Sequence, residues 1–123
     1  MKIEITDLRK IYAIDKEFTA MFPNLKLLFF AKPHTAKGAS PKRLAVSPSK
    51  TVGECRVIHT KGTLTITPHM TVSDLKRELN DTFGLTVGIY HKVSTEWVEV
   101  TTDMVTLEKQ NAGVESPEAA KAL

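Results

Sequence analysis

The sequence predicts an α+β fold, because stretches of helical period and stretches of period two follow one another along its 123 residues. Apolar residues recur at three- and four-residue spacing over residues 8–22 and again over residues 72–83. Shorter alternating runs surround both segments. The length is about that of one domain, and 41% apolar with 25% charged residues is an ordinary globular balance. We therefore expect a single α+β domain over residues 1–123.

Residues 1–31 predict a strand, a helix and a second strand. Residues 2–5 alternate, and the hydroxyl of Thr6 can cap a helix that starts after it. The apolar stripe of this helix is interrupted only by Asp15, and Pro23 ends it. The short, dense apolar run at 25–31 favours a buried strand, with a helix as the lesser possibility.

Residues 32–53 predict a long loop, because they contain three of the six prolines and show no period. They include no acid and five basic residues, Lys32, Lys37, Lys42, Arg43 and Lys50. The segment therefore carries +5, and the rest of the chain sums to −2 within the net charge of +3. Loops of this length are usually functional or disordered.

The second half predicts a hairpin, a helix and a strand pair. Residues 54–59 are expected to be a strand with Cys55, Val57 and His59 on one face, joined through a turn at 60–62 to a strand at 63–67. Thr71 and Asp74 resemble a capping box. The helix that follows buries one apolar face and stops at Gly84; that face consists of Val72, Leu75, Leu79 and Phe83.

The remaining elements are shorter. Residues 86–92 and 96–100 are expected to be two strands joined by a short turn, and residues 106–111 a turn or short helix. The unit over 54–113 is followed by a small, polar tail at 114–123 that is expected to be flexible.

The order of elements over residues 54–112 resembles ubiquitin and its relatives, which share the β-grasp fold. The matching residues are Thr71 to Lys76 at the helix start, Gly84 at its end, and Thr106 with Leu107 near the close. The resemblance implies a helix packed across a mixed sheet, with Leu107 filling the core. Modifiers of this family end in a di-glycine, whereas here ten residues follow Gly113, so a conjugated modifier or sulfur carrier is not expected. The whole chain is also similar, more loosely, to small uncharacterised bacterial proteins, which implies no activity.

The cysteine count and the apolar runs predict a cytoplasmic protein. Cys55 is the only cysteine, so no internal disulfide is possible and a reducing compartment is favoured. Acidic residues Glu4 and Asp7 interrupt the N-terminus, which is unlike a signal peptide. The longest apolar run, at 27–31, is far too short to cross a bilayer.

No pattern of residues indicates catalysis, a metal site or a cofactor. One cysteine with scattered histidines does not supply a zinc ligand set, and Cys55 has no Gly-rich elbow or oxyanion motif around it. Glycine-rich phosphate loops are absent from the sequence. The chain is therefore expected to be non-catalytic and without a cofactor.

The leading hypothesis is a protein-interaction module that binds an unidentified partner through the strand pair 86–100. If Val98 and Val100 face the core, Trp97 faces outward, and Tyr90 or His91 is its neighbour across the hairpin, depending on register. An exposed tryptophan is a typical binding anchor. The alternative that the first helix or the long loop covers Trp97 remains open.

The second hypothesis is a nucleic-acid-binding accessory protein. Its candidate residues are Lys37, Lys42, Arg43 and Lys50, which would neutralise phosphates without reading sequence. A solvated linker is the simpler interpretation of the same segment. The sequence predicts no particular oligomeric state.

Overall fold

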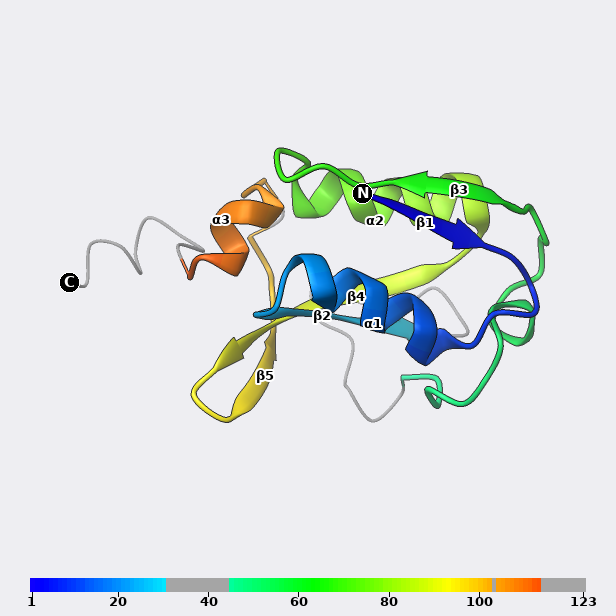
Figure 1. The fold of residues 1–123 in the computed structure, drawn as a ribbon, viewed down its shortest axis with the longest axis horizontal. Coiled ribbons are helices and arrows are strands. Elements are labelled where there is room, and N and C mark those ends of the chain that lie inside the picture. Colours follow the sequence, from blue (N-terminus) through cyan, green and yellow to red (C-terminus); the bar gives the residue numbers. More distant parts are fainter. Residues whose placement is uncertain (31–44, 103, 114–123) are drawn as a thin grey trace.

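The computed structural model describes residues 1–30, 45–102 and 104–113, and it confirms the α+β class (Figure 1). The predicted tail at 114–123 and most of the predicted loop lie outside the described residues. The elements in chain order are β1 (Lys2–Ile5), α1 (Ile11–Met21), β2 (Leu25–Phe30), the 3₁₀ helix η2 (Val52–Cys55), β3 (Gly62–Thr65), α2 (Val72–Phe83), β4 (Thr86–Val93), β5 (Glu96–Glu99) and α3 (Leu107–Asn111).

The strands form two antiparallel sheets. One contains β1 and β3, with Ile3 opposite Leu64, and the other has the strand order β2–β4–β5. In the second sheet Leu27 lies opposite Ile89, and Tyr90 lies opposite Glu99. The side chains that these strands bury join those of α1 and α2 in one hydrophobic cluster. The two sheets therefore share a core.

The first helix begins later than the sequence predicted. Thr6 does not cap it: α1 starts at Ile11 after Lys10, which makes no capping hydrogen bond through its side chain. The predicted helical residue Leu8 lies in the preceding turn and is 88% exposed. Because β1 runs straight into this turn, the chain needs several residues to redirect before the helix can begin.

Asp15, the one polar interruption in the predicted stripe, attaches α1 to the outer edge of β2. Its Oδ1 accepts the backbone N–H of Leu27 at 2.9 Å, and the hydroxyl of Thr19 donates to the carbonyl of Leu25 at 3.0 Å. These contacts satisfy backbone groups that point away from β4. The strand predicted at 25–31 is confirmed as β2, and the helical alternative is wrong.

The strand predicted at 54–59 is wrong, and with it the hairpin through residues 60–62. Residues Val52–Cys55 form η2, started by a capping box between Thr51 and Glu54. Val57, expected on a strand face with Cys55, is 91% exposed. The partner of β3 is instead β1, from the N-terminus, so the pairing that sequence spacing suggested as local is long-range.

The helix predicted at 72–83 is confirmed as α2. Thr71 and Asp74 form the capping box, and Gly84 ends the helix in the left-handed conformation with φ 67°. The N–H of Gly84 donates to the carbonyl of Asn80 at 3.0 Å, as in the αL motif that ends many helices. The four predicted core residues of the helix are 0–2% exposed. Leu107, at the start of α3, is buried as expected.

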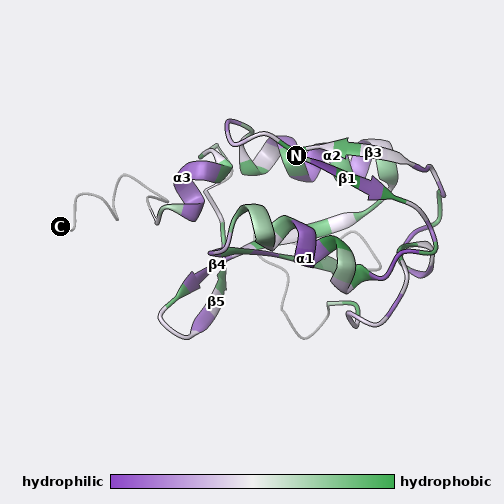
Figure 2. Cartoon of the chain, in the orientation of Figure 1, coloured by the Kyte–Doolittle hydropathy of each residue, from purple (hydrophilic) through white to green (hydrophobic). Residues whose placement is uncertain are grey.

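Among the described residues no helix has the length and apolar character needed to cross a membrane. The hydropathy colouring in Figure 2 places hydrophilic residues on α3 and mixed residues on the β4–β5 hairpin. Hydrophilic and hydrophobic residues therefore both occur along the hairpin.

Candidate functional site

The β4–β5 hairpin projects from the rest of the fold (Figure 1). Its strands are joined by the two residues Ser94 and Thr95, and Ser94 has φ 59°, the left-handed conformation that tight hairpin turns use. This turn sets the register so that Lys92 lies opposite Trp97. Tyr90 or His91 was expected there, and neither occupies that position.

Trp97 forms one wall of an open hollow between the hairpin and α1. The ring is half-buried, and Lys26 Nζ lies 5.8 Å from its centroid, within the range of a cation–π contact. The hollow has a volume of about 460 Å³. Its lining residues are Asp15, Lys16, Thr19, Ala20, Lys26 and Trp97. We call these six residues the Trp97 surface.

Tyr90 and His91 do not belong to this surface, because their exposed fractions are only 1% and 6%. Both were predicted as candidate protein-binding residues, and in the structure both are buried. Burial, the charge of Glu99 and a hydrogen bond to its carboxylate raise the pKa of Tyr90 to about 12. The phenol therefore stays protonated and works as a buried donor to the neighbouring strand.

The outward position of Trp97 was conditional on Val98 and Val100 facing the core, and that face of the hairpin is buried only at its base. Val100 is 3% exposed, whereas Val98 and Val93 are 43% and 46% exposed because the hairpin extends beyond the core. A smaller hollow of about 250 Å³ lies between this face and α3, and His91 and Gln110 contribute to its lining. The hairpin thus presents apolar side chains on this side as well.

Sequence reasoning missed Lys16 and Lys26 as parts of a site. Lys26 and Trp97 lie on β2 and β5, which are separated by β4, so their contact depends on the register of both strand pairs. Lys16 lies on α1, and it is placed near Lys26 because the neighbouring Asp15 binds the backbone of β2. No motif along the chain marks such a group. The alternation of residues 96–100 predicted only that Trp97 and Val98 lie on opposite faces of the strand.

The residues of the nucleic-acid hypothesis are only partly described. Lys37, Lys42 and Arg43 lie outside the described residues. Lys50 is exposed, and its Nζ lies 3.7 Å from Glu54 Oε2. An exposed pair of this kind contributes little to stability and leaves the lysine accessible. The hypothesis stays a prediction.

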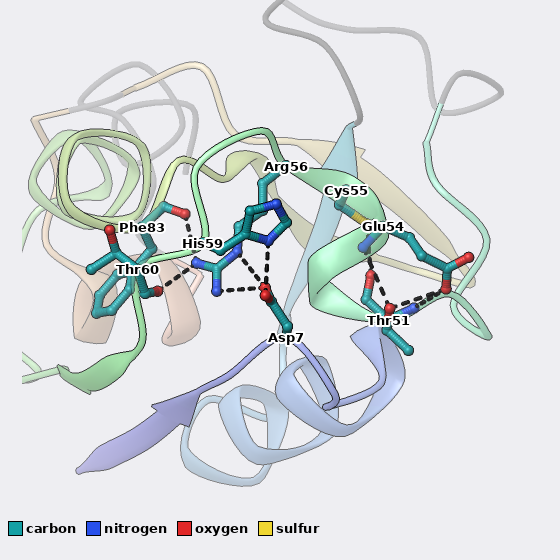
Figure 3. A network of polar contacts seen from close by, with 8 residues as sticks. All are labelled: Asp7, Thr51, Glu54, Cys55, Arg56, His59, Thr60 and Phe83. Atoms are coloured by element: carbon teal, nitrogen blue, oxygen red, sulfur yellow. Dashed lines mark hydrogen bonds and ion pairs between the residues drawn. The ribbon is translucent and has the colours of Figure 1, made fainter.

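A second polar cluster lies where the loop after η2 meets β1 and α2 (Figure 3). The side chain of Arg56 is 0% exposed. Its Nε and Nη2 donate to Asp7 Oδ1 at 3.0 and 2.9 Å, and its Nη1 donates to the carbonyls of Thr60 and Phe83 at 2.7 and 2.8 Å. The other carboxylate oxygen of Asp7 lies 2.8 Å from His59 Nδ1. The hydrogen bond to His59, followed by that to Arg56, lowers the pKa of Asp7.

We call Asp7, Arg56 and His59, together with the carbonyls of Thr60 and Phe83, the Asp7 network. Its acceptors surround the buried guanidinium of Arg56. Arg56 donates to three separate segments, so it fixes the loop against both β1 and the end of α2. Cys55, beside it in sequence, donates its thiol to the carbonyl of Thr51 at 3.3 Å, and burial raises its pKa. The thiol is therefore in its less reactive, protonated form at neutral pH.

The described residues bring together no group of three or more His, Cys, Asp and Glu side chains able to hold a metal ion. Comparisons with protein-family models, with curated proteins and with solved structures found no match. The ubiquitin-like arrangement inferred from the sequence accordingly stays a prediction.

Proposed function

We propose that this chain is a non-catalytic protein-interaction module that binds its partner through the Trp97 surface. The observation that carries the proposal is the position of Trp97, half-buried in the wall of a hollow of about 460 Å³ on a projecting hairpin. Tryptophan is among the residues that contribute most to protein interfaces, because its large ring gains much from losing water. A ring already held on one side loses little entropy on binding.

The lining of the hollow indicates the chemistry of the partner. Lys16 and Lys26 flank the indole, while Oδ1 of Asp15 is occupied by the N–H of Leu27. A partner that inserts an apolar side chain beside an acidic one would satisfy both the ring and the lysines. Because the lysines lie at the surface, their charge is expected to act mainly on the association rate and to be weakened by salt.

The test uses the fact that Trp97 is the only tryptophan of the chain. Chain labelled with 5-fluorotryptophan gives a single ¹⁹F resonance, which reports directly on this ring. Affinity capture from a native extract supplies candidate partners. Each one is then purified and titrated against the labelled chain. A partner that covers the Trp97 surface shifts the resonance in a saturable manner.

Three variants decide the outcome. Trp97→Ala is expected to weaken binding by at least about 30-fold, the size of a hot-spot truncation, and Lys26→Glu is expected to slow association at low salt. Tyr12→Ala is the matched control, because Tyr12 is an aromatic residue of α1 that is 53% exposed and lies outside the hollow. If Trp97→Ala binds every specific partner as tightly as Tyr12→Ala does, the proposed surface is wrong.

A further inference from the structure

The outer edge of β3 presents backbone groups that no described residue satisfies. Met1 and Ile66 exchange backbone hydrogen bonds of 3.0 and 2.8 Å. Because hydrogen-bonded and non-hydrogen-bonded residue pairs alternate in an antiparallel ladder, this pair determines which residues of β3 bond to β1. The backbone of Leu64 therefore faces β1, whereas the N–H and C=O groups of Thr63 and Thr65 face away from it. Both threonines are exposed.

The outer edges of two other strands carry contacts that take up part of their outward backbone groups. At β1 the guanidinium of Arg9 donates to the carbonyl of Glu4 at 3.1 Å. At β2 the outward groups are taken by Asp15, by Thr19 and by the N–H of Val46, which donates to a β2 carbonyl at 2.7 Å. Such contacts prevent one sheet from pairing with another. The edge of β5 adjoins the Trp97 surface, which leaves β3 as the described edge with neither a block nor an assigned role.

We propose that β3 pairs antiparallel with β3 of a second copy of this chain, around a two-fold axis beside Leu64. In this register Thr63 lies opposite Thr65 of the second copy, and each such pair exchanges two N–H···O=C hydrogen bonds. The threonine side chains become cross-strand neighbours, a favourable pairing. Lys61 lies opposite Thr67 of the second copy, so no like charges face each other.

The second copy fits this edge because the strand is complementary to itself. Pairing turns a two-stranded sheet, which is marginal alone, into a four-stranded one. The two-fold axis closes the assembly at a dimer, since each copy uses up its open edge. The paired strand has only four residues, so the interface is small and the dimer is expected to be weak, with a dissociation constant in the micromolar range or above, on the order of 10–1,000 µM.

Sedimentation velocity of the full chain, across that concentration range, tests the proposal. The mass is expected to rise from monomer toward dimer. Amide exchange at Thr63 and Thr65 is expected to slow by about tenfold on the same concentration scale, with no change at amides already bonded to β1. A chain that stays monomeric throughout, whatever else it binds, overturns the proposal.

Two kinds of variant locate the interface. Thr65→Pro removes an outward N–H that β1 does not use, a position where an edge strand tolerates proline, and it is expected to be folded and monomeric. Thr63→Lys with Thr65→Lys places lysines opposite each other and abolishes the dimer, whereas Thr63→Lys with Thr65→Glu pairs opposite charges and retains it. A dimer unaffected by all three changes would place its interface elsewhere. Trp97→Ala leaves this dimer intact, so failure here is distinguishable from failure of the proposed function.

Discussion

Residues 71–85 and residues 51–61 meet at the end of α2 but are held in place in different ways. In the first segment both ends of the helix are set locally: the capping box joins Thr71 to Asp74, and Gly84 ends the last turn. In the second, only the short 3₁₀ helix has a local cap, and Arg56 and His59 hold the residues that follow it. The distant partners of Arg56 are 49 residues away at Asp7 and 27 residues away at Phe83.

A polar residue can carry structural information within one helical turn or across the whole fold. The polar residues that cap α2 form hydrogen bonds within one turn, so their spacing in the sequence predicts where the helix begins. Arg56 acts across the fold, because a guanidinium can be buried only when distant groups accept its protons. Nothing around it in sequence says which groups those are. Substitutions at the two segments should therefore differ in what they disturb.

The largest effect is expected for Arg56→Met. The change leaves the carbonyls of Thr60 and Phe83 without a donor and removes two hydrogen bonds to Asp7, so we expect a loss of about 3 kcal/mol in the free energy of unfolding. Urea unfolding at constant m-value measures it. Arg77→Met is the matched control: Arg77 is an exposed arginine of α2, and its replacement should change stability by less than about 0.5 kcal/mol. Equal effects at the two arginines would mean that the Asp7 network does not hold the loop.

A smaller effect is expected where the two segments touch, at Gly84. Its φ of 67° disfavours any side chain, and a Cβ built there would lie 2.3 Å from Ile58 Cγ1. Gly84→Ala is therefore expected to cost about 1–2 kcal/mol for the backbone, with a further steric part. Thermal unfolding of Gly84→Ala, of Ile58→Ala and of the double variant separates the backbone cost from the steric cost.

In that cycle Ile58→Ala should remove the steric part and leave the backbone part. The alanine at position 84 would then cost less in the Ile58→Ala background than in the wild type. Ile58 is 48% exposed, so its own truncation is expected to be mild. Strictly additive effects would show that the loop shifts away from Gly84 and that the two segments are not coupled there.

The same contrast explains how much could be predicted from the sequence. The α+β class, α2 with its caps and buried face, the strand β2 and the outward parity of Trp97 follow from periodicity and from capping and turn residues that lie within a few positions of one another. The start of α1 was misplaced because Thr6 has the chemistry of a cap but lies in the turn that redirects β1. Local chemistry permits a cap without requiring it.

The candidate site was less predictable because it depends on pairing between distant strands. Residues 54–59 alternate as a strand does, yet they begin in the 3₁₀ helix η2, and β3 pairs with β1 from the N-terminus. Tyr90 or His91 was expected opposite Trp97 because the register of the hairpin, which places Lys92 there, was unknown. Lys16 and Lys26 join Trp97 only after α1 has docked on β2.

The smallest effect is expected in the pH dependence of the free energy of unfolding. The contributions of two aspartates to this dependence should have opposite signs. Desolvation raises the pKa of Asp15 above its ordinary value of 3.8, against the hydrogen bond from the N–H of Leu27 and the charge of Lys26. Folding therefore favours its protonated form. The stability that this shift contributes is fully present below the unfolded pKa and is lost as pH rises through the folded pKa. At Asp7 the pKa is lowered by His59 and Arg56, so its contribution is present above the unfolded pKa and is lost as pH falls.

Asp15→Asn and Asp7→Asn separate the two, because an asparagine keeps an acceptor oxygen and does not titrate. Urea unfolding between about pH 7 and pH 3 measures the stability of each variant relative to the wild type. As the pH falls, the stability of the wild type is expected to rise relative to that of Asp15→Asn. Over the same range, the stability of the wild type is expected to fall relative to that of Asp7→Asn. Parallel curves for the two variants would mean that Asp15 is as well solvated when folded as when unfolded. The attachment of α1 to the edge of β2 would then rest on the Thr19 hydroxyl and on apolar packing, not on the carboxylate.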